Sequence, residues 1–166
     1  MSMQINNTPE DLSPVSAEIE VNKQIENLPV SDPMTFVVED DKANNFLCQM
    51  TLEEVGITNL HMFMRAEPTL DALKNLVKTN QEFPSLILLD INMPAMDGWA
   101  FLEQYRAFPE AARSKTTIYL FSSSDHPNDL AKKEMYPEVL DFLAKPLSEE
   151  VANTLKEKYF RPRIAA

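Results

Sequence analysis

Five short apolar runs, each followed by a polar turn and a helix-like pattern, constrain the fold of this chain more than any other feature. The runs predict strands at residues 35–39, 61–66, 85–90, 116–122 and 139–144. Between and after them, apolar residues recur at the spacing of an amphipathic helix. Strands that alternate with helices are joined by right-handed crossovers and form a parallel sheet that is buried on both faces. The sequence therefore predicts an α/β fold, a doubly wound five-stranded parallel sheet with helices on both faces.

Five helices are expected from apolar spacing and from start and stop signals. The first includes Cys48, which we expect to be buried and to serve packing. The predicted helices are one through Phe46, Leu47, Met50, Leu52 and Val55 that stops near Gly56, one from Pro68 or Thr69 through Val77, one over 98–107, one from Pro127 or Asn128 to near Pro137, and one that Ser148 opens and that runs through Leu155.

Domain organisation follows from a change in composition near residue 33. Residues 1–33 contain four prolines and six acidic residues against Lys23 alone. Such a segment cannot bury enough apolar surface to fold, so we expect an acidic, mostly disordered leader, with a docking segment as the alternative. Residues 34–160 form the predicted domain and residues 161–166 a C-terminal tail. A chain of 166 residues suffices for one well-developed core.

Charge and composition exclude several classes of function. The net charge is −11, so we expect no binding to nucleic acid or to anionic membranes. Only two glycines are present, which excludes glycine-rich phosphate-binding loops, and two histidines with one cysteine make a zinc site improbable. No apolar run is long enough to span a bilayer, no secretory signal is evident, and a lone cysteine fits a reducing compartment. We therefore expect a cytoplasmic protein.

Polar groups that suit phosphoryl chemistry follow four of the predicted strands. Acids at 39–41 follow the first strand, Asp90 ends the third, hydroxyls at 122–124 end the fourth, and Lys145 follows the fifth. Because ligands bind at the carboxyl ends of the strands in such sheets, these groups are expected to converge at one edge.

This set of side chains suits a divalent cation and a phosphoryl group. Neighbouring carboxylates repel one another, and Mg²⁺ relieves this repulsion while it keeps positions for phosphate oxygens. Lys145 adds a positive charge that can bind phosphate. Phosphoryl transfer to Asp90 needs mainly positioning and charge neutralisation, which these groups supply.

The ordered combination of Glu39-Asp40, Asp90, Ser122 and Lys145-Pro146, together with the stretch DINMPAMDGW (90–99), resembles the receiver domain of two-component response regulators. The resemblance covers about residues 34–160 and implies the flavodoxin-like receiver fold. It implies that Asp90 is the phosphoacceptor and that Lys145 pairs with it. It also implies that Mg²⁺ is bound by Asp40, by Asp90 and by the backbone carbonyl of Asn92, with Glu39 holding a metal-bound water.

Further roles are implied by the same resemblance. Ser122 would bind a phosphoryl oxygen, and Phe142 would be the aromatic switch residue that turns inward when Ser122 moves. The output surface would be the fourth and fifth helices with the fifth strand between them. Ser123 would be a small residue beside the path of the phosphodonor, Ser124 would influence the lifetime of the acyl phosphate, and Pro146 would follow the lysine in a peptide bond that is often cis.

The resulting functional hypothesis is a stand-alone receiver, a signalling phosphoacceptor rather than an enzyme, whose partners are a sensor histidine kinase or histidine phosphotransfer protein and a downstream protein target. The alternative is a pseudo-receiver that is never phosphorylated and acts as a protein-interaction module. An aspartyl-phosphate phosphatase is rejected, because Asn92 stands where its second acid is needed. A calcium loop at 90–98 is rejected because Pro94 interrupts it and Phe101 replaces the bidentate acid. Asp97 is expected to cap the next helix, Asp41 to be solvated, and Trp99 to serve packing.

Overall fold

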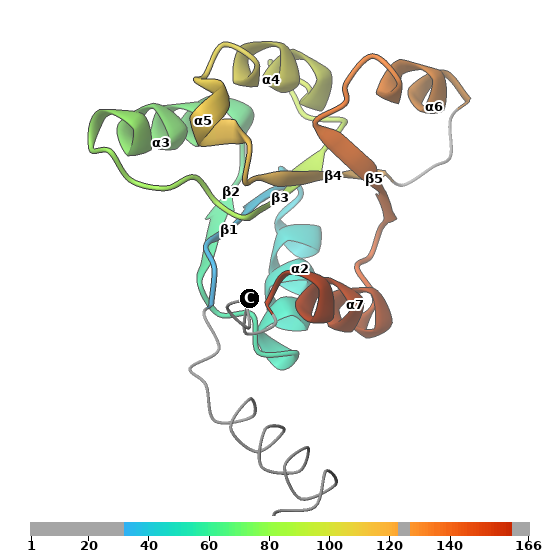
Figure 1. Cartoon of the computed structure of the whole chain (residues 1–166). Helices are drawn as coiled ribbons and strands as arrows, with labels where there is room; N and C mark the ends of the chain where they lie inside the picture. Colours follow the sequence, from blue (N-terminus) through green and yellow to red (C-terminus); the bar gives the residue numbers. More distant parts are fainter. Residues whose placement is uncertain (1–31, 123–126, 161–166) are drawn as a thin grey trace, which may run out of the picture. The chain divides into compact units, whose positions relative to one another are not determined.

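The computed structural model describes residues 32–122 and 127–160 and contains a five-stranded parallel sheet (Figure 1). Its strand order is β2-β1-β3-β4-β5, and every neighbouring pair is parallel. The order therefore reverses between β1 and β3, and the predicted fold class is confirmed. The strands are β1 (Thr35–Val38), β2 (Leu60–Phe63), β3 (Leu86–Asp90), β4 (Thr117–Ser122) and β5 (Val139–Ala144).

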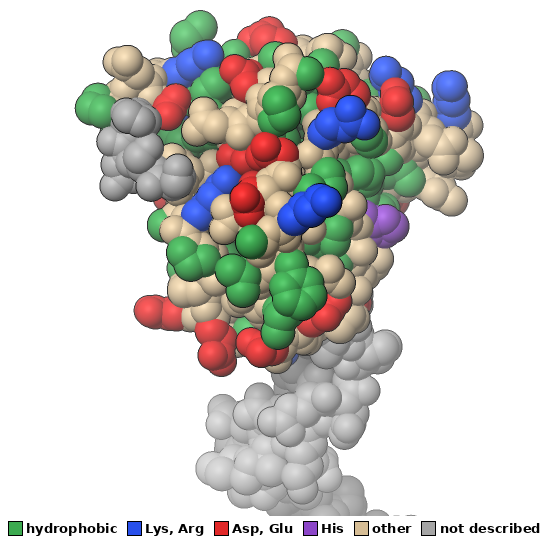
Figure 2. Space-filling model, turned by 180° about the vertical axis from the view of Figure 1, so that it is seen from behind, with side chains coloured by type: hydrophobic (Ala, Val, Ile, Leu, Met, Phe, Trp, Pro, Cys, Tyr) green, Lys and Arg blue, Asp and Glu red, His purple; other side chains and the backbone are tan. Residues whose placement is uncertain are grey.

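Helices cover both faces of this sheet. In Figure 1, α2 and α7 lie on one side, while α3, α4 and α6 lie on the other. The helices of the described residues are α2 (Lys42–Glu54), α3 (Ala66–Lys78), α4 (Gly98–Tyr105), α5 (Glu110–Arg113), α6 (Pro127–Lys133) and α7 (Glu149–Tyr159). None of them is long and apolar enough to cross a membrane. Figure 2 shows one face of the molecule, on which hydrophobic, acidic and basic side chains are interspersed.

Alternation along the central strands divides the apolar residues between two cores. In β3, Ile87 and Leu89 belong to the core under α3 and α4, whereas Leu86 and Leu88 belong to the core under α2 and α7. All four are completely buried. A strand that is buried on both faces consists of an unbroken apolar run, which explains the sequence LILL before Asp90.

The observed elements differ from the predicted ones at several points. Strand β2 spans Leu60–Phe63 rather than 61–66, and α4 ends at Tyr105 rather than at 107. Helix α3 begins at Ala66 rather than at Pro68 or Thr69, because proline is tolerated in the first turn, where its missing N–H has no helical partner. Helix α6 ends at Lys133, before Pro137. Helix α5 was not predicted, since four residues are too few to show a period.

The apolar pattern that indicated α2 is misleading about which face is buried. Phe46, Leu47 and Met50 are 60%, 48% and 42% exposed. The buried residues of α2 are Leu52, which the pattern included, and Asn45 and Cys48. The buried state expected of Cys48 is thereby confirmed.

A register shift between β4 and β5 determines which face Phe142 joins. Ile118 pairs with Val139 but Tyr119 pairs with Asp141, so Leu140 is an extra residue in β5. Strict alternation would place Val139 and Phe142 on opposite faces of the sheet. Because of the bulge, both contact the core under α3 and α4.

Residues 1–31 of the predicted acidic leader and the whole predicted tail, residues 161–166, lie outside the described residues. Asp32 is described, and its carboxylate accepts hydrogen bonds from the backbone N–H and hydroxyl of Thr58 at 3.2 Å and 2.5 Å. Its backbone carbonyl accepts a bond from Asn59 Nδ2 at 3.0 Å. The chain is thus attached to the loop between α2 and β2 before β1 begins.

Candidate functional site

Three carboxylates meet at the carboxyl edge of the sheet, where the strand order reverses. Glu39 and Asp40 follow β1, and Asp90 is the last residue of β3. Oxygen atoms of the three carboxylates lie within 4.8 Å of one another. Glu39 and Asp90 are each only 2% exposed, whereas Asp40 is half-buried. The two central strands therefore deliver the acids to one point, as the order of residues predicted.

Lys145 joins this cluster from the segment after β5. Its Nζ lies 2.6 Å from Glu39 Oε2 and 3.0 Å from Asp90 Oδ1. Its backbone N–H donates to the carbonyl of Ser122 at 3.2 Å, which fastens the end of β5 to the end of β4. The peptide bond between Lys145 and Pro146 is cis.

The charges of these groups perturb one another. Burial raises the pKa of Asp90, and the hydrogen bond and charge of Lys145 oppose that rise. Burial also raises the pKa of Asp40, and the adjacent carboxyl of Asp90 raises it further. Burial alone would lower the pKa of Lys145, but hydrogen bonds to Glu39 and Asp90 outweigh this effect and raise it. A second cation at the cluster would therefore relieve the remaining repulsion between the acids.

Backbone groups hold the acidic side chains in place. The N–H of Asn92 donates to Asp90 Oδ1 at 3.1 Å, and the N–H of Asp41 donates to Glu39 Oε1 at 3.1 Å. Asp41 is exposed, as expected, and it is also the N-cap of α2, since its carboxylate accepts a bond from Asn44 N at 2.8 Å.

The loop after Asp90 leads into α4 with very close backbone packing. Asp97 caps α4 as predicted, because Oδ1 accepts a bond from Ala100 N at 2.8 Å. The N–H of Gly98 donates to the carbonyl of Ile91 at 2.8 Å. A Cβ atom at Gly98 would lie 2.6 Å from the carbonyl oxygen of Asp90. The glycine therefore allows α4 to start directly against the backbone of Asp90.

Both residues expected to switch, Ser122 and Phe142, are described. Ser122 ends β4 next to Lys145. Phe142 is half-buried against the core under α3 and α4, and Lys133 Nζ lies 6.0 Å from the centre of its ring. Ser123 and Ser124 lie outside the described residues.

The cluster fits Mg²⁺ by the chemistry of its donors. Mg²⁺ takes oxygen ligands and typically one or two carboxylates, and the partly exposed Asp40 with the buried Asp90 offers such a pair. Both carboxylate oxygens of Glu39 have partners, Lys145 Nζ at Oε2 and Asp41 N at Oε1, whereas Asp90 contacts Lys145 and Asn92 N through Oδ1 alone. This is compatible with the water-mediated role that the resemblance to receiver domains implied for Glu39.

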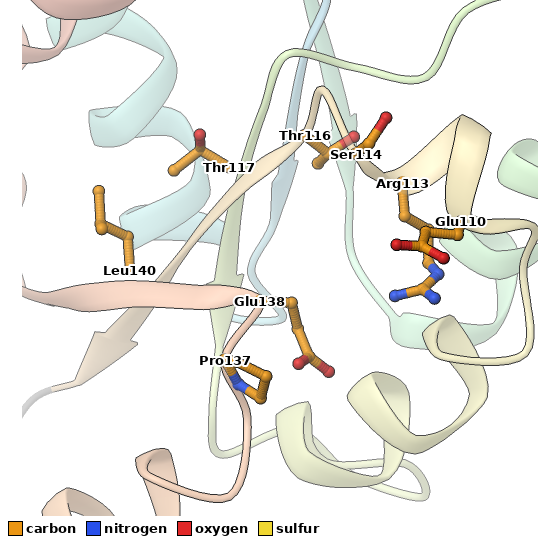
Figure 3. A pocket seen from close by; sticks show the side chains of 8 residues that line it. All are labelled: Glu110, Arg113, Ser114, Thr116, Thr117, Pro137, Glu138 and Leu140. Atoms are coloured by element: carbon orange, nitrogen blue, oxygen red, sulfur yellow. The ribbon is translucent and has the colours of Figure 1, made fainter.

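A hollow of about 430 Å³ lies away from this cluster, at the amino edge of the sheet (Figure 3). Its walls come from α5, from the start of β4 and from the segment that leads into β5. Thr117 is the first residue of β4, whereas the acids follow the opposite ends of the strands. The hollow is therefore separate from the acidic site. The residues that line it are Glu110, Arg113, Ser114, Thr116, Thr117, Pro137, Glu138 and Leu140.

Sequence reasoning missed one buried polar residue beside the acids. Asn45 is 8% exposed, and its side-chain amide donates to the backbone carbonyls of Glu39 and Phe63. An asparagine on the inward face of a helix that otherwise buries Cys48 and Leu52 was the available signal.

Comparison with known proteins agrees with this geometry. A family model of the response regulator receiver domain matches residues 35–156. The probable methanogenesis regulatory protein FilR2 of Methanothrix harundinacea is 28% identical over 133 residues, which cover 78% of this chain and 84% of FilR2. The sensor protein GacS of Pseudomonas syringae is 32% identical over 118 residues, which cover 70% of this chain but only 12% of GacS.

Among solved structures, a two-component response regulator from Cytophaga hutchinsonii is similar, with a TM-score of 0.67 and 26% identity over 78% of this chain and 97% of that one. The fold, the acidic edge and the family match thus define one class of signalling module. The chain belongs to the response regulator receiver domain family of two-component systems.

Proposed function

We propose that this receiver domain accepts a phosphoryl group on Asp90 from a phosphohistidine of a sensor kinase or phosphotransfer protein. The observation that carries the proposal is the contact of Lys145 with both Glu39 and Asp90, beside the carboxylate of Asp40. A structural salt bridge would need one acid for the lysine, whereas three acids around one cation leave a surplus of negative charge that suits a metal ion.

The residues have distinct parts in this transfer. A carboxylate oxygen of Asp90 attacks phosphorus, the bond between phosphorus and the donor's imidazole nitrogen breaks, and the imidazole keeps the electron pair and takes up a proton. Lys145 neutralises charge on the phosphoryl oxygens. Bound Mg²⁺ would supply further neutralisation, held by Asp40, by Asp90 and by the backbone carbonyl of Asn92, with Glu39 binding one of its waters.

The response to transfer is proposed to pass through Ser122 and Phe142. Ser122 lies at the end of β4 beside the Lys145 backbone, so a new phosphoryl oxygen can draw its hydroxyl inward. Phe142 is only half-buried, which leaves it free to move toward the core that it already touches. The surface around α6, β5 and α7 would then bind a protein target differently in the two states.

The test is the intact mass after incubation with acetyl phosphate, with and without Mg²⁺. We expect a magnesium-dependent gain of one phosphoryl group that Asp90→Asn abolishes while the variant stays folded, because the change is nearly isosteric. Asp97→Asn is the matched control, since asparagine also caps helices and Asp97 lies in the same loop. No gain in the wild-type chain would favour an unphosphorylated interaction module instead.

A further inference from the structure

Asn45 is a buried amide directly beneath the acidic cluster. Its Nδ2 donates to the backbone carbonyl of Glu39 at 3.1 Å and to that of Phe63 at 3.3 Å. Glu39 directly follows β1, and Phe63 is the last residue of β2, the strand that pairs with β1. In the described part of the chain, three of the five buried polar or charged residues belong to this region. The five are Thr35, Glu39, Asn45, Thr69 and Asp90.

The amide acts on the peptide group that carries two of the acids. The carbonyl of Glu39 belongs to the peptide bond between Glu39 and Asp40, so anchoring it fixes the direction of both side chains. The same segment is held elsewhere by the bond from Asp41 N to Glu39 Oε1 and by the bond from Asn45 N to the Asp41 carbonyl at 2.8 Å. The peptide cannot rotate without breaking buried hydrogen bonds.

Such anchoring matters because the carboxylates repel one another. Oxygens of Glu39, Asp40 and Asp90 lie within 4.8 Å of one another, so their negative charges repel. A loosely held backbone would let Asp40 move away from Asp90. A tightly held backbone keeps the two carboxylates next to each other.

We propose that Asn45 is a positioning residue that sets the preference of this site for Mg²⁺ over Ca²⁺. The inference rests on the proposed function, because it assumes that Asp40 and Asp90 bind a cation. Mg²⁺ requires near-ideal octahedral geometry with oxygens at about 2.0–2.1 Å, whereas Ca²⁺ accepts about 2.3–2.6 Å and irregular geometry. Loss of the anchor therefore weakens Mg²⁺ binding more than Ca²⁺ binding.

The experiment measures Mn²⁺ binding to the full chain from the electron paramagnetic resonance signal of the free ion, with Mg²⁺ or Ca²⁺ as competitor. In Asn45→Ala, we expect the affinity for Mg²⁺ to fall about tenfold, in line with the loss of other residues that orient metal ligands. The affinity for Ca²⁺ should change by less than about threefold, because its coordination is flexible. Asn45→Ser keeps a donor for one carbonyl and should give an intermediate ratio.

Thr69→Ala is the matched control. It removes another buried polar group, whose hydroxyl donates to the Arg65 carbonyl at 2.9 Å at the start of α3. We expect it to lower the melting temperature as Asn45→Ala does, without changing the ratio of Mg²⁺ to Ca²⁺ affinity.

An unchanged ratio in Asn45→Ala, or an equal loss for both ions, would overturn the positioning role while the cation site stands. Absence of Mn²⁺ binding by the wild-type chain would overturn the cation site and this inference with it. If Asn45→Ala does not fold, the ratio in Asn45→Ser decides.

Discussion

At the scale of single residues, the two glycines of this chain are required for different reasons. Gly98 has no room for a side chain, because a Cβ atom would lie 2.6 Å from the Asp90 carbonyl oxygen and 3.0 Å from Ile91 Cα. Gly56 has a φ of +86°, in the left-handed region that favours glycine, and its nearest neighbour would be the flexible end of Lys156 at 3.2 Å. Gly98 therefore allows α4 to pack against the backbone of Asp90, and Gly56 allows the chain to turn after α2.

The same substitution should therefore have different effects at the two positions. Gly98→Ala should lower the free energy of unfolding by about 1–3 kcal/mol through overpacking and should slow acetyl phosphate labelling, because the backbone of Asp90 must shift. Gly56→Ala should cost about 1–2 kcal/mol through backbone strain and leave labelling at the wild-type rate. Urea denaturation and intact mass measure both effects. Wild-type labelling by Gly98→Ala would show that α4 does not constrain Asp90.

Cys48, which lines a small pocket with Glu39 and Lys145, provides a pH-dependent prediction. Burial, with a smaller effect from Glu39, raises the pKa of its thiol from 9.0 to about 12. Because the thiolate is the nucleophile, iodoacetamide should label the native chain very slowly at pH 8 and the urea-denatured chain quickly. Raising the pH from 9 to 12 should lower stability, since only the unfolded chain ionises its thiol fully in that window. Equal labelling rates in both states, followed by mass, would contradict the burial of Cys48.

At the scale of elements, the end of α4 is joined to the segment between α6 and β5. Arg106 forms an ion pair with Glu138 at 2.7 Å, donates to the Met135 carbonyl, and lies 4.3 Å from the centre of the Tyr136 ring. Tyr136 in turn donates to Glu103 at 2.7 Å. Helix α6 has no buried residue. This cluster therefore anchors α6 through the segment that follows it.

Arg106→Ala should release that anchor. We expect a loss of about 1–3 kcal/mol, because a charge-assisted hydrogen bond and a cation–π contact disappear together. Amide hydrogen exchange, measured by mass spectrometry, should accelerate in α6 more than in α3. The control is Lys115→Ala, which breaks a largely exposed pair with Glu82 and should cost less than about 1 kcal/mol. Equal acceleration in α3 would mean that the cluster stabilises the whole domain and not α6.

The elements could be predicted where local pattern and tertiary packing agree. Apolar runs indicated all five strands, most clearly β1 and β3, in which every residue is buried, because a strand covered on both faces needs no polar face. For α2 the pattern correctly predicted a helix and the burial of Leu52, but not the rest of the inward face. Phe46, Leu47 and Met50 face outward, and Asn45 faces inward to reach the carbonyls of Glu39 and Phe63. The pattern also could not reveal the bulge at Leu140, because nothing in the sequence of β5 marks a residue without a partner in β4. The bulge is visible only in the pairing of the two strands.

At the scale of the whole molecule, the candidate site was predictable because topology determines it. Once strands alternate with helices, the residues after β1, β3 and β5 must meet at one edge, and their order alone brought Asp40, Asp90 and Lys145 together. The supporting contacts were not predictable, since the bonds of Asn45 and the capping role of Asp41 depend on where backbone carbonyls and N–H groups lie. The residues at the strand ends could thus be predicted from the sequence, whereas the hydrogen bonds that hold them in place could not.

The lower limit of the folded unit is set by Asp32 rather than by the start of β1. Residues 32–161 form one compact unit, and Asp32 contributes hydrogen bonds to Thr58 and Asn59 across the loop that precedes β2. These bonds hold the entrance to β1 against its neighbouring strand. A chain shortened at residue 32 retains them, whereas one shortened at residue 34 does not.

A shortened chain of residues 32–161, begun with an added methionine, should therefore unfold at the same urea concentration as the full chain and accept acetyl phosphate at the same rate. Residues 34–161 should be less stable by about 1 kcal/mol, because exposed hydrogen bonds contribute modestly, and should still be labelled, since the acids lie at the other end of β1. Asp32→Asn in the full chain separates charge from chain length and should lie between the two. If residues 32–161 were markedly less stable than the full chain, the flanking residues would contribute to the fold, and the domain limit would have to be moved outward.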